Sequence, residues 1–133
     1  MKLQSRVAIV TGAGGGLGRS HALYLARHGA KVLVNDLDQG MADKVAAEIT
    51  SAGGEALGFG ASVTDEARVA AMVEKVMGAW GRVDILINNA GILRDKSFAK
   101  MSMEVFRRGV DVHLMGSVIP TKAVWEIMRT QNY

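Results

Sequence analysis

The sequence predicts a doubly wound α/β domain built on a parallel sheet. Short apolar, β-branched runs alternate with longer segments of helical periodicity along the 133 residues. Five glycines fall between Gly12 and Gly18, where the first apolar run meets the first helical segment, and Asp36 ends the second run. The pattern favours the strand order 3-2-1-4 with helices on both faces, and a ligand crevice where the order reverses.

The first strand is expected over residues 6–10, and the first helix starts within the glycine run and stops at Gly29. The glycines therefore lie in a strand-to-helix turn. Backbone N–H groups and the positive end of the helix dipole make such a turn a site for phosphate. The alternative is a tight turn without a ligand.

The second strand is expected over residues 31–36, the second helix over 39–54, and a weaker third strand over 55–60. Four residues of that helix share its predicted inward face: Met41, Val45, Ile49 and Ala52.

The third helix is expected over residues 64–81, with Thr64 as its N-cap. Its predicted inward residues are Val69, Met72, Val73 and Val76. A fourth strand over residues 83–91 and a long helix from Ser102 complete the alternation.

Composition indicates one globular domain over residues 1–133, with 49% hydrophobic residues, 22% charged residues and one proline. The absence of cysteine excludes disulfides and Cys-ligated metals, and we expect no metal site. We expect a cytoplasmic protein without a signal peptide or membrane span. The net charge of +3 is dispersed, with one adjacent basic pair at Arg107 and Arg108, so nucleic acid is not an expected partner.

Asp36 lies 18 residues beyond Gly18, close to the spacing at which an acid binds the ribose hydroxyls of a dinucleotide. Its charge would repel a 2′-phosphate, which favours NAD over NADP. The alternative is that Asp36 and Asp38 only form a turn or cap the next helix.

Two segments resemble the short-chain dehydrogenase/reductase family, which has a Rossmann-type fold. "TGAGGGLG" at 11–18 is similar to its dinucleotide signature, and "NNAG" at 88–91 to its second signature. Gly15 stands where NADP-dependent members often carry a basic residue, so the resemblance also implies NAD. It assigns cofactor binding to these residues: Gly12, Gly15, Gly16, Leu17, Gly18, Asp36, Ser62, Val63, Asn89, Ala90 and Gly91.

"GILRDKSF" at 91–98 and "VHLMGS" at 112–117 resemble a subgroup, the dehydrogenase unit of peroxisomal-type multifunctional enzymes and their bacterial relatives. That subgroup oxidises (3R)-3-hydroxyacyl-CoA. His113 stands where the wider family has an Asn of the proton relay, which makes it a catalytic candidate. The alternative is a core histidine, because helical spacing predicts one inward face for these residues: Phe106, Val110, His113, Ser117, Val124 and Met128.

The resemblance implies hydride transfer between NAD and a secondary alcohol or ketone, with a Tyr-x-x-x-Lys pair as the general base. No such pair is present, because Tyr24 is followed at that spacing by His28 and Tyr133 is the last residue. We therefore expect the amino-terminal, cofactor-binding half of such an enzyme, inactive by itself. An inactive nucleotide-binding or interaction module is the alternative. An unpaired fourth strand and an uncovered final helix predict a homo-oligomer.

Overall fold

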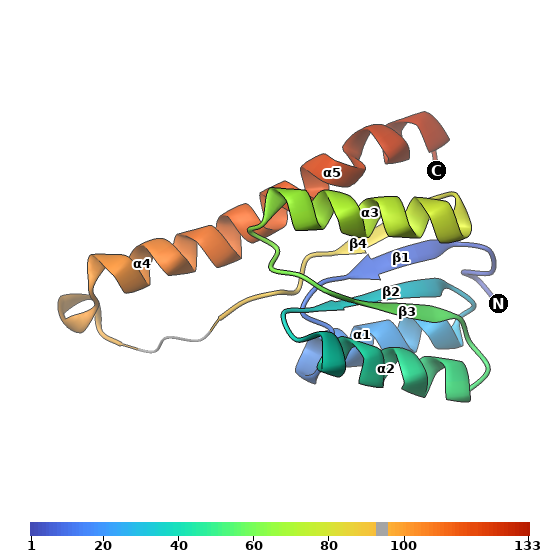
Figure 1. Cartoon of the computed structure of the whole chain (residues 1–133), viewed down its shortest axis with the longest axis horizontal. Helices are drawn as coiled ribbons and strands as arrows, with labels where there is room; N and C mark the ends of the chain where they lie inside the picture. The colour runs from blue at the N-terminus through green and yellow to red at the C-terminus, as the bar shows by residue number, and fades with distance from the viewer. Residues whose placement is uncertain (93–95) are drawn as a thin grey trace.

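The computed structural model describes residues 1–92 and 96–133. Its sheet has four parallel strands in the order β3-β2-β1-β4, which confirms the predicted order (Figure 1). Ile9 of the central strand pairs in register with Leu33 and with Leu86. The strand bounds are as follows: β1 (Val7–Val10), β2 (Lys31–Asp36), β3 (Ala56–Gly60) and β4 (Ile85–Ile87).

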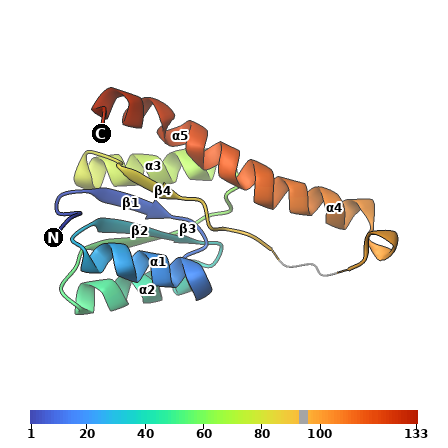
Figure 2. The same ribbon diagram turned by 180° about the vertical axis from the view of Figure 1, so that it is seen from behind.

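Helices cover both faces of the sheet (Figures 1 and 2). On one face, α1 (Gly16–Arg27) and α2 (Gln39–Ser51) enclose a core that includes Val10, Val34 and Ile49. On the other, α3 (Glu66–Trp80) and α5 (Gly116–Gln131) enclose a core that includes Ile9, Met72 and Val124. Because the side chains of β1 and β2 alternate between these cores, all of β1 and residues 32–34 of β2 are apolar.

A helical arm leads from β4 to the end of the chain (Figure 1). It contains a short 3-10 helix, η1 (Phe98–Lys100), then α4 (Met103–Gly109), a π-helical segment, η2 (Val110–Met115), and α5. The side chain of Ser102 accepts a hydrogen bond from the Val105 amide at 3.2 Å, as expected for the residue that begins this helix. The predicted long helix is thus present, with a π turn inside it.

Two of the predicted inward positions of α2 are wrong. Met41 is 48% exposed and Ala52 is also exposed. The buried stripe keeps Val45 and Ile49 of the prediction and is completed by Ala42 and Ala46. Small alanines let this helix lie close to the sheet, whereas a stripe centred on Met41 would not. The inward residues predicted for α3 are all buried.

Two predicted boundaries are also wrong. The N-cap of α3 is Asp65, whose side chain accepts from the Arg68 amide at 3.1 Å, and not Thr64. The fourth strand ends at Ile87 rather than Gly91, because the amides of Asn89 and Ala90 turn to the hydroxyl of Thr11.

Candidate functional site

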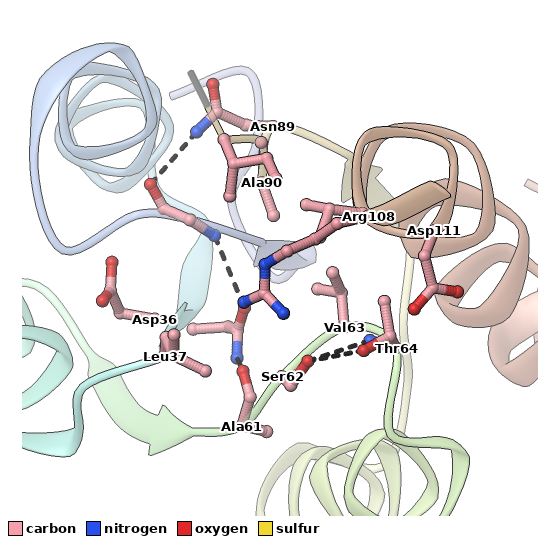
Figure 3. Close-up of a pocket in the computed structure, with 15 residues that line it drawn as sticks. Asp36, Leu37, Ala61, Ser62, Val63, Thr64, Asn89, Ala90, Arg108 and Asp111 are labelled. Carbon is pink, nitrogen blue, oxygen red and sulfur yellow. Dashed lines mark hydrogen bonds between the residues drawn. The ribbon is translucent and has the colours of Figure 1, made fainter. Parts of the chain in front are cut away.

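A pocket of about 330 Å³ lies at the carboxyl ends of β1, β2 and β4 (Figure 3). This is where the strand order reverses, the place at which doubly wound sheets bind ligands. The pocket is lined by seven of the predicted cofactor-binding residues: Gly12, Asp36, Ser62, Val63, Asn89, Ala90 and Gly91. The chain thus brings together both quoted glycine-containing segments and the acid that ends β2.

The glycine turn packs tightly against the segment that follows β4. Gly12 has a φ of +62°, and a Cβ there would lie 2.8 Å from the Cα of Ala90. A Cβ on Gly18 would overlap the Gly12 carbonyl oxygen and the side chain of Asn89. That amide donates to the same carbonyl oxygen at 3.1 Å, so only glycine fits this close approach.

Gly15, Gly16 and Leu17 form the start of α1 and are not among the described residues that line the pocket. Gly16 has a φ of +54°, and Leu17 is 73% exposed. Gly15 is the N-cap and offers no side-chain acceptor, whereas Asp38, Asp65 and Ser102 cap α2, α3 and α4. The first amides of α1 therefore keep their capacity to bind an anion.

The carboxylate of Asp36 stabilises the glycine turn and can still accept hydrogen bonds from a ligand. Its Oδ2 accepts from the Gly14 amide at 3.0 Å, and its Oδ1 accepts from the Asp38 amide at 3.1 Å. Asp38 in turn caps α2 by accepting from the Met41 amide. Each carboxylate oxygen of Asp36 can accept a second hydrogen bond, so its turn-forming role does not exclude ligand binding.

Sequence reasoning missed two buried polar residues that assemble the site. The Thr11 hydroxyl accepts from the amides of Asn89 and Ala90, both at 3.0 Å. The Asn35 side chain donates to the carbonyl oxygens of Phe59 and Ala61 at 3.1 Å, and accepts from the Gly12 amide at 3.4 Å. A polar residue at the end of an otherwise apolar strand was the signal that could have identified both.

Sequence reasoning also missed Arg108 and Asp111, which reach the pocket from the helical arm (Figure 3). Their spacing of three residues places them on the same side of the helix. This spacing was visible in the sequence, but nothing in it indicated that the arm would pass over the pocket.

His113 is exposed, so its predicted inward position is wrong. Phe106 and Val110 of the same predicted face are 43% and 42% exposed, whereas Val124 is buried. The reason is that α4 and η2 extend beyond the sheet, and only α5 packs on it (Figure 1).

The His113 ring contacts the backbone that follows the second glycine-containing segment. Its Nε2 lies 2.7 Å from the Ile92 carbonyl oxygen and 3.2 Å from the Ile92 amide nitrogen. A protonated Nε2 donates to the carbonyl, and an unprotonated one accepts from the amide. A Cβ on Gly91 would lie 2.7 Å from the ring. Within the quoted stretch 91–98, residues 93–95 lie outside the described part of the chain.

Neither tyrosine lies at the pocket. The ring of Tyr24 in α1 packs against the ring of His28, with centroids 4.3 Å apart and planes tilted by 45°. Arg6 lies 3.5 Å above the ring of Tyr133. Over residues 1–92 and 96–133 no group of acids and histidines is arranged to hold a metal ion. Among the helices of the same residues, none has the length and apolar character needed to cross a membrane.

The fold and the pocket define an α/β domain of the doubly wound, Rossmann-like class. A family model described as short chain dehydrogenase matches residues 6–133. The chain therefore belongs to the short-chain dehydrogenase family, whose members are oxidoreductases with a nucleotide cofactor.

The chain is similar over its whole length to larger proteins. It is 49% identical to peroxisomal multifunctional enzyme type 2 of Drosophila melanogaster and 45% identical to peroxisomal hydratase-dehydrogenase-epimerase of Saccharomyces cerevisiae. It spans 23% and 16% of these relatives. A crystal structure of a short chain dehydrogenase from Mycobacterium avium superimposes with a TM-score of 0.91 at 40% identity, and the match covers 98% of this chain and 48% of that one.

Proposed function

We propose that the chain is the cofactor-binding part of an NAD-dependent dehydrogenase that transfers hydride between NAD and a secondary alcohol or ketone. The observation that carries the proposal is the pocket in which Gly12, Asp36 and the segment 89–91 meet. These come from three separate parts of the sequence, and each has the chemistry that one portion of a dinucleotide requires.

The residues present fit this cofactor. The glycine turn leaves no room for a Cβ at Gly12 or Gly18 and ends at a helix N-terminus without a side-chain cap, which suits a pyrophosphate. Asp36 would accept hydrogen bonds from the ribose hydroxyls, and Ser62 and Val63 would lie beside the adenine ring. Asn89, Ala90 and Gly91 would border the cofactor on the opposite side. When bound, NAD supplies the hydride acceptor, and the protein positions it.

The preference for NAD over NADP rests on Asp36. A 2′-phosphate would lie beside this carboxylate, and position 15 carries glycine rather than a cation. Like charges close together in a partly desolvated site oppose binding.

The substrate is proposed from similarity. The resemblance of residues 91–98 and 112–117 to the dehydrogenase unit of peroxisomal-type multifunctional enzymes suggests a (3R)-3-hydroxyacyl-CoA. His113 would act by holding the Gly91–Ile92 backbone against the cofactor. We propose that the 133 residues alone do not turn substrate over, because no Tyr-x-x-x-Lys pair is present to take the hydroxyl proton. Positioned proton transfer typically contributes about 10²- to 10⁴-fold to the rate.

The absence of that pair also favours a second candidate, a nucleotide-binding or interaction module without catalysis. Calorimetric titration with NAD and a hydride-transfer assay with 3-hydroxyacyl-CoA separate the possibilities. NAD binding without turnover by the 133-residue chain, together with turnover by a version extended with a relative's catalytic segment, supports the dehydrogenase. Binding without turnover in both supports a nucleotide-binding module. A chain that binds no nucleotide contradicts the dehydrogenase and leaves only an interaction module.

We propose that the chain forms a homo-oligomer. β4 is an edge strand of the sheet, and Trp125 of α5 is 59% exposed. An unprotected apolar edge and a large exposed aromatic ring both favour association. Light scattering at micromolar concentration tests this, since a 14.2 kDa monomer would contradict it. A cytoplasmic location stays a prediction, and fractionation of cells would check it.

A further inference from the structure

We propose that Arg108 binds the adenine base of the cofactor by stacking its guanidinium group on the ring. The inference rests on the proposed binding of NAD and adds a residue to which neither the sequence motifs nor the proposed function give a role. It depends on three features of Arg108: its direction, its charged neighbours, and the residues across the pocket from it.

The side chain of Arg108 points into the pocket. It extends from α4 across the cavity, with Leu37 on the far side and Ser62 and Val63 along one wall (Figure 3). Arg108 is exposed, so neighbouring residues of the helical arm do not cover its side chain or keep it from a ligand. A flat molecule in this part of the pocket would therefore lie within reach of the guanidinium group.

The positive charge of Arg108 is not neutralised by the neighbouring acids of the described chain. Asp111 follows three residues later and lines the same pocket, yet the two do not form one of the ion pairs found in residues 1–92 and 96–133. Asp36 also lines the pocket, but its oxygens accept from the backbone amides of Gly14 and Asp38. A guanidinium that forms no salt bridge with the described residues can turn its planar face to a ligand.

The surroundings suit a base better than a phosphate. Leu37, Ala61 and Val63 are apolar, and Leu37 is 73% exposed at the rim although it lines the pocket. Phosphate binding is provided elsewhere, by the glycine turn and the start of α1. An aromatic ring between an apolar side chain and a guanidinium gains cation–π attraction and stacking together.

The test is calorimetric titration of the whole chain and two variants with NAD, AMP and adenosine. We expect Arg108→Ala to weaken binding of all three ligands by a similar factor, about 3- to 30-fold. Arg107→Ala is the matched control, because it removes the same charge from the next position of the helix and Arg107 does not line the pocket. It should leave all three affinities unchanged.

The outcomes separate this inference from the proposed function. If the unaltered chain binds none of the ligands, the proposed function fails and the inference with it. If it binds NAD and Arg108→Ala binds equally well, only the inference is overturned. A loss for NAD and AMP but not for adenosine would show a phosphate contact and overturns the stacking. Equal losses in both arginine variants would show a general charge effect and also overturn it.

Discussion

The two ends of the sheet each hold an aspartate, and the chain treats them in opposite ways. At the amino end, the side chain of Asp84 is fully buried. It accepts from the Val7 amide at 3.0 Å and from two Arg82 nitrogens at 2.7 and 2.6 Å, with Arg6 at 3.7 Å. At the carboxyl end, Asp36 is half-buried and accepts from two backbone amides. The first carboxylate is saturated by side chains and one backbone amide, whereas the second can still accept hydrogen bonds from a ligand.

The amino end is also closed by the last turn of the chain. The side-chain amide of Gln131 accepts from the Val83 amide at 3.0 Å and donates to the Val83 carbonyl at 2.7 Å, as a neighbouring strand would. It also donates to Asp84 at 3.2 Å. Polar groups at the amino end of the sheet therefore hold the fold together, whereas those at the carboxyl end leave a pocket open.

The largest expected effect on stability comes from Asp84→Ala. Removing this carboxylate leaves the Val7 amide and two arginines without their acceptor, and we expect a loss of about 2 to 4 kcal/mol in the free energy of unfolding. Urea denaturation followed by circular dichroism measures it. Asp36→Ala is the control at the other end and should cost less. Equal losses at the two ends would contradict the comparison.

Lowering the pH should destabilise the fold through protonation of Asp84. Burial alone would raise the pKa of Asp84, but the hydrogen bonds from Arg82 and Val7 and the charges of Arg82 and Arg6 outweigh it, so the pKa lies below its ordinary value of 3.8. A carboxyl with a lowered folded-state pKa stabilises above its unfolded pKa, and this contribution is lost as the pH falls through the folded value. Urea midpoints below pH 4 should therefore fall less steeply in Asp84→Asn than in the unaltered chain. If the urea midpoints of the two chains fall in parallel with pH, Asp84 is not the residue responsible for the acid sensitivity.

Gly18→Ala should disrupt the glycine turn at the carboxyl end of the sheet. The added methyl group would force the glycine turn away from Asn89, and we expect a loss of about 1 to 3 kcal/mol in stability together with weaker NAD binding. Gly78→Ala is the matched control, because Gly78 is exposed in α3 and a Cβ there meets nothing within 4 Å. That change should stabilise the chain by about 0.5 to 1 kcal/mol. Differential scanning calorimetry measures the stability of both variants, and titration calorimetry measures their affinity for NAD.

The sequence was most informative where local pattern and tertiary structure agree. The strand order followed from the alternation of periodicities, and the pocket followed from the glycine turn, Asp36 and the segment 88–91. Part of the buried stripe of α2 was missed because alanine gives little periodic signal, although Ala42 and Ala46 belong to that stripe. Neither the exposure of His113 nor the position of Arg108 was predictable, since both depend on how far the arm extends beyond the sheet.

The last expected difference concerns the choice between the two cofactors. Asp36→Ala removes the charge that opposes a 2′-phosphate, and we expect the preference for NAD over NADP to shrink by about 1 to 3 kcal/mol. Paired titrations with the two cofactors measure it. Asp38→Ala removes an acid two residues away that caps α2, and should leave the ratio unchanged. A preference that survives Asp36→Ala would place the discrimination elsewhere.

We expect NAD to bind at the carboxyl end of the sheet and at no other place in residues 1–92 and 96–133. Nuclear magnetic resonance of the ¹⁵N-labelled chain, titrated with NAD, tests this residue by residue. We expect amide shifts to move at Gly12, Gly18, Asp36, Val63 and Gly91, while the amides of the Asp84 and Gln131 end stay in place. Shifts confined to that amino end, or none at all in the presence of excess NAD, would contradict the claim.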